Sequence, residues 1–116
     1  MSKQTIGLIQ TAVSDDPDHN LKHALDMAGL AISKGARIIS LPELYRAPYF
    51  LQYEDTDASA YAETIPGQST EAFSALAREH GAVIILPIYE RAASGEYYNS
   101  AVVIDADGRV LFPAYR

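Results

Sequence analysis

The chain has 116 residues, with 9 basic against 15 acidic side chains and a formal net charge of −6. This length predicts one small domain, and 48% apolar with 21% charged residues is typical of a globular rather than a disordered chain. The acidic balance argues against nucleic acid or an anionic membrane as a partner, since no basic patch is available to release phosphate counterions. The absence of cysteine excludes disulfides, thiolate metal sites and a thiol nucleophile within these residues.

The beginning of the chain has no apolar signal-peptide region, and no stretch approaches 18 consecutive apolar residues. We therefore expect a cytoplasmic protein.

The first third of the chain follows a strand, helix, strand pattern. Residues 6–12 are mostly apolar, which predicts a central strand covered on both faces. Asp16 and Pro17 suit the cap and first position of a helix whose apolar residues recur at three- and four-residue steps, and Gly35 ends it. Residues 38–41 predict a second strand, parallel to the first. This pattern is typical of an α/β fold.

The middle of the chain lacks the regular apolar pattern of the first third. Residues 42–67 show no sustained periodicity and predict a long loop, with a helical turn at 58–63. A second helix is expected from a cap at Ser69 or Thr70 to a stop at Gly81.

The last third predicts strands. Residues 82–88 form an apolar run typical of a buried strand. Residues 97–104 and 109–112 predict a hairpin, because residues 105–108 between them end in Asp-Gly, a turn sequence. The phenol and amide groups of residues 97–100 could line a pocket. A mixture of aromatic and polar residues is also typical of a half-exposed strand, the interpretation we favour.

Glu43 is the candidate catalytic residue that position alone suggests. It follows the second expected strand, and ligands of open parallel sheets bind at the carboxyl ends of strands. A carboxylate there could serve as a general base, or it could be a solvated turn residue. His19 and His23 have the spacing of metal ligands, but the sequence offers no third ligand, so we expect no metal site.

Several segments in this order resemble the carbon-nitrogen hydrolase (nitrilase) superfamily, most of all its N-carbamoyl amidase branch, such as N-carbamoylputrescine amidase. The resemblance covers nearly the whole chain and indicates the N-terminal portion of such a domain over residues 1–116. The segments that carry it are residues 6–11, 35–39, 41–44, 48–50, 65–67, 88–91, 98–101, 105–108 and 115–116.

The resemblance implies an αββα sandwich, built on a mixed sheet with helices, and catalysis by a Glu base, a Lys that stabilises the oxyanion and a Cys nucleophile. Glu43 matches the Glu. Tyr49 becomes a candidate for the substrate pocket, and Glu90 a candidate carboxylate near the Lys; packing within the loop and a solvated strand end are the alternatives. The resemblance implies no metal or organic cofactor, a small amide or carbamoyl amine as substrate, and homo-oligomers.

The family's Lys normally follows the Tyr-Arg pair at residues 115–116, and its Cys lies further on. We therefore expect this chain to be inactive alone, with sheet edges and one apolar face left uncovered. An alternative is a noncatalytic assembly piece that folds by docking onto a complementary chain or onto itself. The acidic residues Glu54, Asp55 and Asp57 would suit a cationic amine substrate or form a solvated run.

Overall fold

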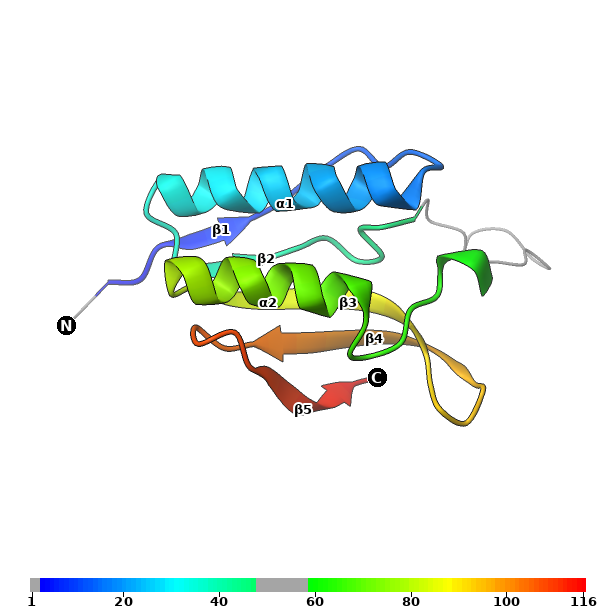
Figure 1. Ribbon diagram of the computed structural model, residues 1–116. Coiled ribbons are helices and arrows are strands. Elements are labelled where there is room, and N and C mark those ends of the chain that lie inside the picture. The colour runs from blue at the N-terminus through cyan, green and yellow to red at the C-terminus, as the bar shows by residue number, and fades with distance from the viewer. Residues whose placement is uncertain (1–2, 48–58) are drawn as a thin grey trace.

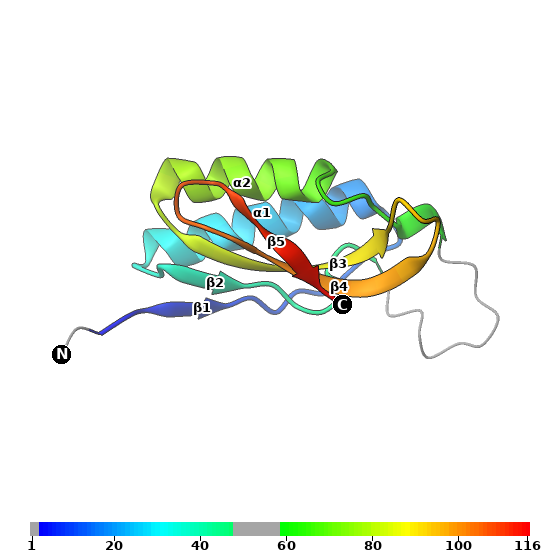
Figure 2. The same ribbon diagram turned by 90° about the horizontal axis from the view of Figure 1, so that it is seen from below.

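The chain folds into two layers, with a mixed sheet on one side and two long helices on the other (Figures 1 and 2). The structure, a computed structural model, describes residues 3–47 and 59–116. In chain order its elements are β1 (Ile6–Leu8), α1 (Pro17–Ser33), β2 (Ile38–Ser40), the short 3-10 helix η2 (Ser59–Tyr61), α2 (Gln68–His80), β3 (Val83–Arg91), β4 (Tyr97–Ile104) and β5 (Val110–Tyr115).

The sheet is parallel at one end and antiparallel at the other. Its strand order is β1-β2-β3-β4-β5, with β1, β2 and β3 parallel and β4 and β5 added antiparallel. The expected mixed α/β sheet with helices is therefore confirmed. The C-terminal ends of β2 and β3 lie at the same edge, where the expected long loop begins.

The first helix begins and ends as the sequence predicts. The Asp16 side chain accepts hydrogen bonds from the backbone amides of Asp18 and His19, and Pro17 occupies the first turn. Gly35 follows the helix with a φ of 100°, a conformation that favours glycine.

The second helix ends at Gly81 as expected but begins earlier than expected. Its N-cap is Gly67 rather than Ser69 or Thr70, and the Thr70 hydroxyl accepts a hydrogen bond from the Gly67 amide at 2.7 Å. A Cβ on residue 67 would lie 2.4 Å from the carbonyl oxygen of Thr64. Only glycine therefore allows the chain to turn this closely into α2.

The core lies between the helices and one face of the sheet. Alternate residues of β3, among them Ile84 and Leu86, are fully buried there, together with Val102 of β4. Phe73 of α2 and Ala28 of α1 close the core from the helix side.

In the part of the chain that the structure describes, the opposite face of the sheet carries no helix (Figure 2). The expected covering of the first strand on both faces is wrong for the described part of the chain, because β1 is a short edge strand with Leu8 77% exposed. The expectation of an uncovered apolar face is confirmed there. Large exposed apolar side chains on this helix-free face are Ile6, Leu8, Tyr97, Leu111 and Tyr115.

Two further expectations hold with shifted boundaries, whereas residues 48–58 of the expected loop at 42–67 lie outside the described residues. The short helix η2 falls within the expected turn at 58–63, and β3 continues three residues beyond the expected end at residue 88. The expected hairpin at the end of the chain is confirmed, with the Gly108 amide donating to the Asp105 carbonyl in its turn. No helix in the described residues is long and apolar enough to cross a membrane.

Candidate functional site

Glu43 lies in a tight turn that follows β2. The turn contains Leu44 in the left-handed backbone region, with a φ of 51°, and the Ala47 amide closes it by donating to the Leu44 carbonyl at 3.0 Å. Leu44 is buried, so its packing offsets a conformation that costs a nonglycine residue roughly 1–2 kcal/mol. Glu43 itself is solvent-exposed, which leaves both a general base and a solvated turn residue open from its exposure alone.

The Glu43 carboxylate contacts a residue far along the chain. The Asn99 side-chain amide donates a hydrogen bond to Glu43 Oε1 at 2.7 Å across a separation of 56 residues. Asn99 lies opposite Tyr89 in the β3–β4 pairing, on the helix-free face. The strand interpretation of residues 97–100 is thus confirmed, and one member of that strand also reaches the candidate base.

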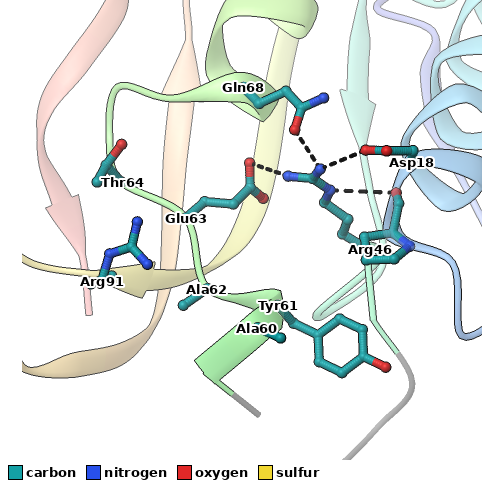
Figure 3. A pocket seen from close by; sticks show the side chains of 10 residues that line it. Asp18, Arg46, Ala60, Tyr61, Ala62, Glu63, Thr64, Gln68 and Arg91 are labelled. Atoms are coloured by element: carbon teal, nitrogen blue, oxygen red, sulfur yellow. Dashed lines mark hydrogen bonds and ion pairs between the residues drawn. The ribbon is translucent and has the colours of Figure 1, made fainter.

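A largely buried ion pair between Arg46 and Glu63 holds the turn that carries Glu43. Arg46 Nη1 lies 2.8 Å from Glu63 Oε1, and the two side chains are 13% and 7% exposed. The same guanidinium contacts Asp18 at the start of α1 and Gln68 at the start of α2 (Figure 3). Arg46 therefore joins the beginnings of both helices to the turn that carries Glu43.

Glu63 also completes the N-terminus of α2. Its carboxylate accepts a hydrogen bond from the Ser69 amide at 2.9 Å and another from the Ser69 hydroxyl at 2.7 Å. The first amides of a helix lack partners within the helix and carry partial positive charge, so a carboxylate there is stabilising. Since the Ser69 proton goes to Glu63, the buried Tyr45 hydroxyl donates to Ser69. Burial raises the pKa of Tyr45, which stays a neutral donor.

The hollow beside Arg46 is separate from Glu43. It has a volume of about 410 Å³ and brings Arg46 and Arg91 together with Asp18 and Glu63, as Figure 3 shows. Opposite charges are mixed along its wall, and Glu43 does not line it. The hollow therefore reflects the corner where the helices meet the turn rather than a substrate site around the candidate base.

Glu90 is buried on the helix side of the sheet. It accepts hydrogen bonds from Arg116 Nε and Nη2, both at 3.0 Å, and from the Ser100 hydroxyl at 2.8 Å. The Arg116 guanidinium also lies over the Tyr98 ring, 4.4 Å from its centroid. Hydrogen bonds from Arg116, and secondly from Ser100, lower the pKa of Glu90 against the opposing effect of burial. The alternative of a solvated charge at a strand end is wrong for Glu90.

The structure does not bring the predicted site residues into one cluster. Glu43 and Asn99 lie on the helix-free face, whereas Glu90 lies on the helix side, because consecutive residues of a strand point to opposite faces. Tyr49 and the acidic residues Glu54, Asp55 and Asp57 lie outside the described residues. His19 and His23 stack on α1 with ring centroids 6.2 Å apart, and His19 is exposed.

Sequence reasoning missed Arg46, Glu63 and Asn99 as members of the site. The first two lie in the predicted long loop, where no periodicity indicates which charges are buried. Asn99 carried a signal, since the phenol and amide groups of residues 97–100 had suggested a pocket wall. Its partner, Glu43, could not be predicted, because local sequence patterns carry no information on contacts between residues 56 positions apart.

Replacing Glu63 by Ala is expected to destabilise the chain by about 1–3 kcal/mol, because it removes the acceptor of the Ser69 amide and leaves exposed Asp18 as the remaining described ion-pair partner of Arg46. Asp18→Ala is the matched control, since Asp18 contacts the same guanidinium but its side chain is 80% exposed. Urea unfolding followed by circular dichroism measures both. Equal losses in the two variants would show that the buried pair has no special role.

Glu90 is expected to make stability depend on acid. Because its pKa is lower in the folded chain, its ion pair stabilises the fold above the ordinary value of 4.5, and this contribution is lost as the pH falls through the folded-state pKa. Glu90→Gln should therefore flatten the loss of stability between about pH 5 and pH 3. Glu79→Gln, which removes an exposed carboxylate of α2, is the matched control for the change in net charge. Parallel slopes for wild type and Glu90→Gln would contradict the assignment.

Comparison with known proteins identifies the family and the fold. Residues 5–116 match the model of the carbon-nitrogen hydrolase family. The crystal structure of a carbon-nitrogen hydrolase from Helicobacter pylori G27 superimposes with a TM-score of 0.85 at 30% identity, covering 97% of this chain and 39% of that one. The architecture is therefore that of a nitrilase-type fold.

Two curated relatives bear on the branch. Omega-amidase NIT2-B from Xenopus laevis is 38% identical over 111 residues, 96% of this chain and 39% of the relative. N-carbamoylputrescine amidase from Solanum lycopersicum is 36% identical over 108 residues, 92% of this chain and 36% of the relative. The chain thus spans about two fifths of the length of the relatives it matches. Because the family model matches nearly the whole chain and the sheet agrees with it, the chain belongs to the carbon-nitrogen hydrolase family.

Proposed function

We propose that this chain supplies the glutamate-bearing portion of an amidase, with Glu43 as the general base. The observation that carries the proposal is the placement of Glu43, at the carboxyl ends of parallel strands and held by Asn99. Among the described residues Oε1 is occupied by this hydrogen bond, which leaves Oε2 to exchange a proton. A base at this edge can carry protons between a nucleophile, a leaving amine and water.

Glu90 has a separate role in this proposal. Its two-point contact with Arg116 fixes the end of β5 against β3 on the helix side. Side chains alternate along a strand, so a residue following Arg116 would project toward the helix-free face, where Glu43 lies. In the family that residue is normally the Lys that stabilises the oxyanion. Glu90 would then orient the Lys through Arg116 without touching substrate.

The proposed substrate is a linear amide, split by thiol chemistry that needs a Cys. Since residues 1–116 contain no Cys, we propose that they have no hydrolytic activity alone. An N-carbamoyl amine and an omega-amide are the two substrate classes that the named relatives favour. We keep the N-carbamoyl amine, with Tyr49 in its pocket, as the prediction to be tested against the omega-amide.

The test uses the gene product that contains residues 1–116, with its intact mass measured first. It is assayed by ammonia release from N-carbamoylputrescine and from an omega-amide. Glu43→Gln should lower kcat by about 100- to 10,000-fold, the usual contribution of a general base, while circular dichroism and the unfolding midpoint stay unchanged. Glu79→Gln, an exposed carboxylate on α2, is the control. Undiminished turnover by Glu43→Gln would exclude Glu43 as the base.

A second candidate function is assembly without catalysis, and the helix-free face favours it. That face exposes large apolar side chains, including Leu8 at 77% and Tyr115 at 71%. We expect the 116-residue chain to associate with itself at micromolar concentration, as measured by sedimentation velocity. Replacing Leu8 by Glu should shift it toward monomer, whereas Leu30→Glu on exposed α1 should not. A compact wild-type monomer at all concentrations would contradict an assembly role.

A further inference from the structure

We infer that Asn99 is the positioning residue of Glu43, which fixes carboxylate oxygen Oε1 and thereby directs proton transfer to Oε2. The inference rests on the proposed function of Glu43 as base. Its geometric part, a side-chain contact between two residues 56 positions apart, stands independently of any activity.

The chemistry of the two groups determines which atoms meet. An ionised carboxylate can only accept hydrogen bonds, so the Asn99 amide must present its NH2 group and not its carbonyl oxygen. The distance of 2.7 Å from Nδ2 to Oε1 is that of a charge-assisted hydrogen bond. An oxygen that already accepts this bond is the poorer site for an incoming proton. Protonation is therefore directed to the other oxygen, Oε2.

Both partners are held by backbone that is fixed for other reasons. Asn99 is in register with Tyr89 in the middle of the β3–β4 pairing. The turn that carries Glu43 is held by the buried Arg46–Glu63 pair, and Asn20 donates to the Arg46 carbonyl at 2.8 Å. Because neither backbone has to be ordered by the contact, the hydrogen bond costs only the side-chain rotamer freedom of two residues.

A second contact joins the strand pair that carries Asn99 to the turn that carries Glu43. The Tyr89 and Tyr97 rings stack on the helix-free face with centroids 5.6 Å apart and an interplanar angle of 23°. Tyr89 is also packed against the cluster formed by Leu44 and Ala47, which belongs to the Glu43 turn. Tyr89, the cross-strand partner of Asn99, therefore packs against the same turn whose Glu43 carboxylate accepts the Asn99 hydrogen bond.

The contact can be tested on the 116-residue chain by NMR, because the sequence contains only two asparagines, Asn20 and Asn99. The Asn20 amide donates to the carbonyl oxygens of Ser14 and Arg46, so it serves as an internal control. With asparagine labelled selectively, the Asn99 NH2 signals should shift when acidification protonates the carboxylates, while those of Asn20 stay in place. In Glu43→Gln the Asn99 shift should disappear.

The positioning role is tested in the gene product that contains this chain. Asn99→Leu should lower kcat by about 10- to 100-fold with KM changed less than about 2-fold, because the base is misplaced while substrate binding is retained. Asn99→Gln, which keeps the amide, should recover part of the loss. Asn99→Leu should also leave the unfolding midpoint nearly unchanged, since Asn99 is solvent-exposed.

The two experiments test the contact, the positioning role and the proposed function separately. Asn99 signals that ignore the titration in wild type would overturn the contact and with it the inference. A preserved contact with no loss of kcat in Asn99→Leu would overturn the positioning role but leave Glu43 as base. If the gene product shows no amidase activity while the NMR shift is present, the proposed function fails and Asn99 is reduced to a structural partner of Glu43.

Discussion

The buried pair between Arg46 and Glu63 is the interaction on which the arrangement of this chain most depends. Removing two charges from water is costly, and the attraction between them repays that cost only when the remaining donors and acceptors are satisfied. Here they are satisfied by groups from separate elements: Asp18 of α1, and Gln68 and Ser69 of α2. The pair is therefore specific to one packing of both helices on the sheet, and it determines where the turn after β2 lies.

The buried charged groups and the candidate site lie on opposite faces of the sheet. The helix side of the sheet holds the fixed charges, among them Glu90 with its paired guanidinium of Arg116. The helix-free face holds Glu43 and Asn99, which are exposed and free of the core. A site built this way takes its precision from buried contacts behind it and its access from the open side.

Much of the fold could be predicted from local pattern, and the site only in part. Both long helices have apolar faces and clear stops, so periodicity and glycines located them. The start of α2 was misplaced because the need for Gly67 arises from its approach to Thr64, a contact that propensity does not contain. Glu43 could be found from its position after a strand and from a resemblance. Arg46, Glu63 and Asn99 could not be assigned, because their partners are set by packing between segments rather than by spacing.

Neighbouring side chains of β4 make contacts on opposite faces of the sheet, and this restricts the register of β4 against β3. Ser100 donates to Glu90 beneath the helices, while its neighbour Asn99 meets Glu43 on the other face. A slip of β4 by one residue against β3 would exchange them, bringing an amide into the core and a short hydroxyl to the candidate base. A misregistered strand would thus lose the buried and the exposed contact together. The stability of the core and the position of the candidate base therefore depend on the same hydrogen-bond ladder.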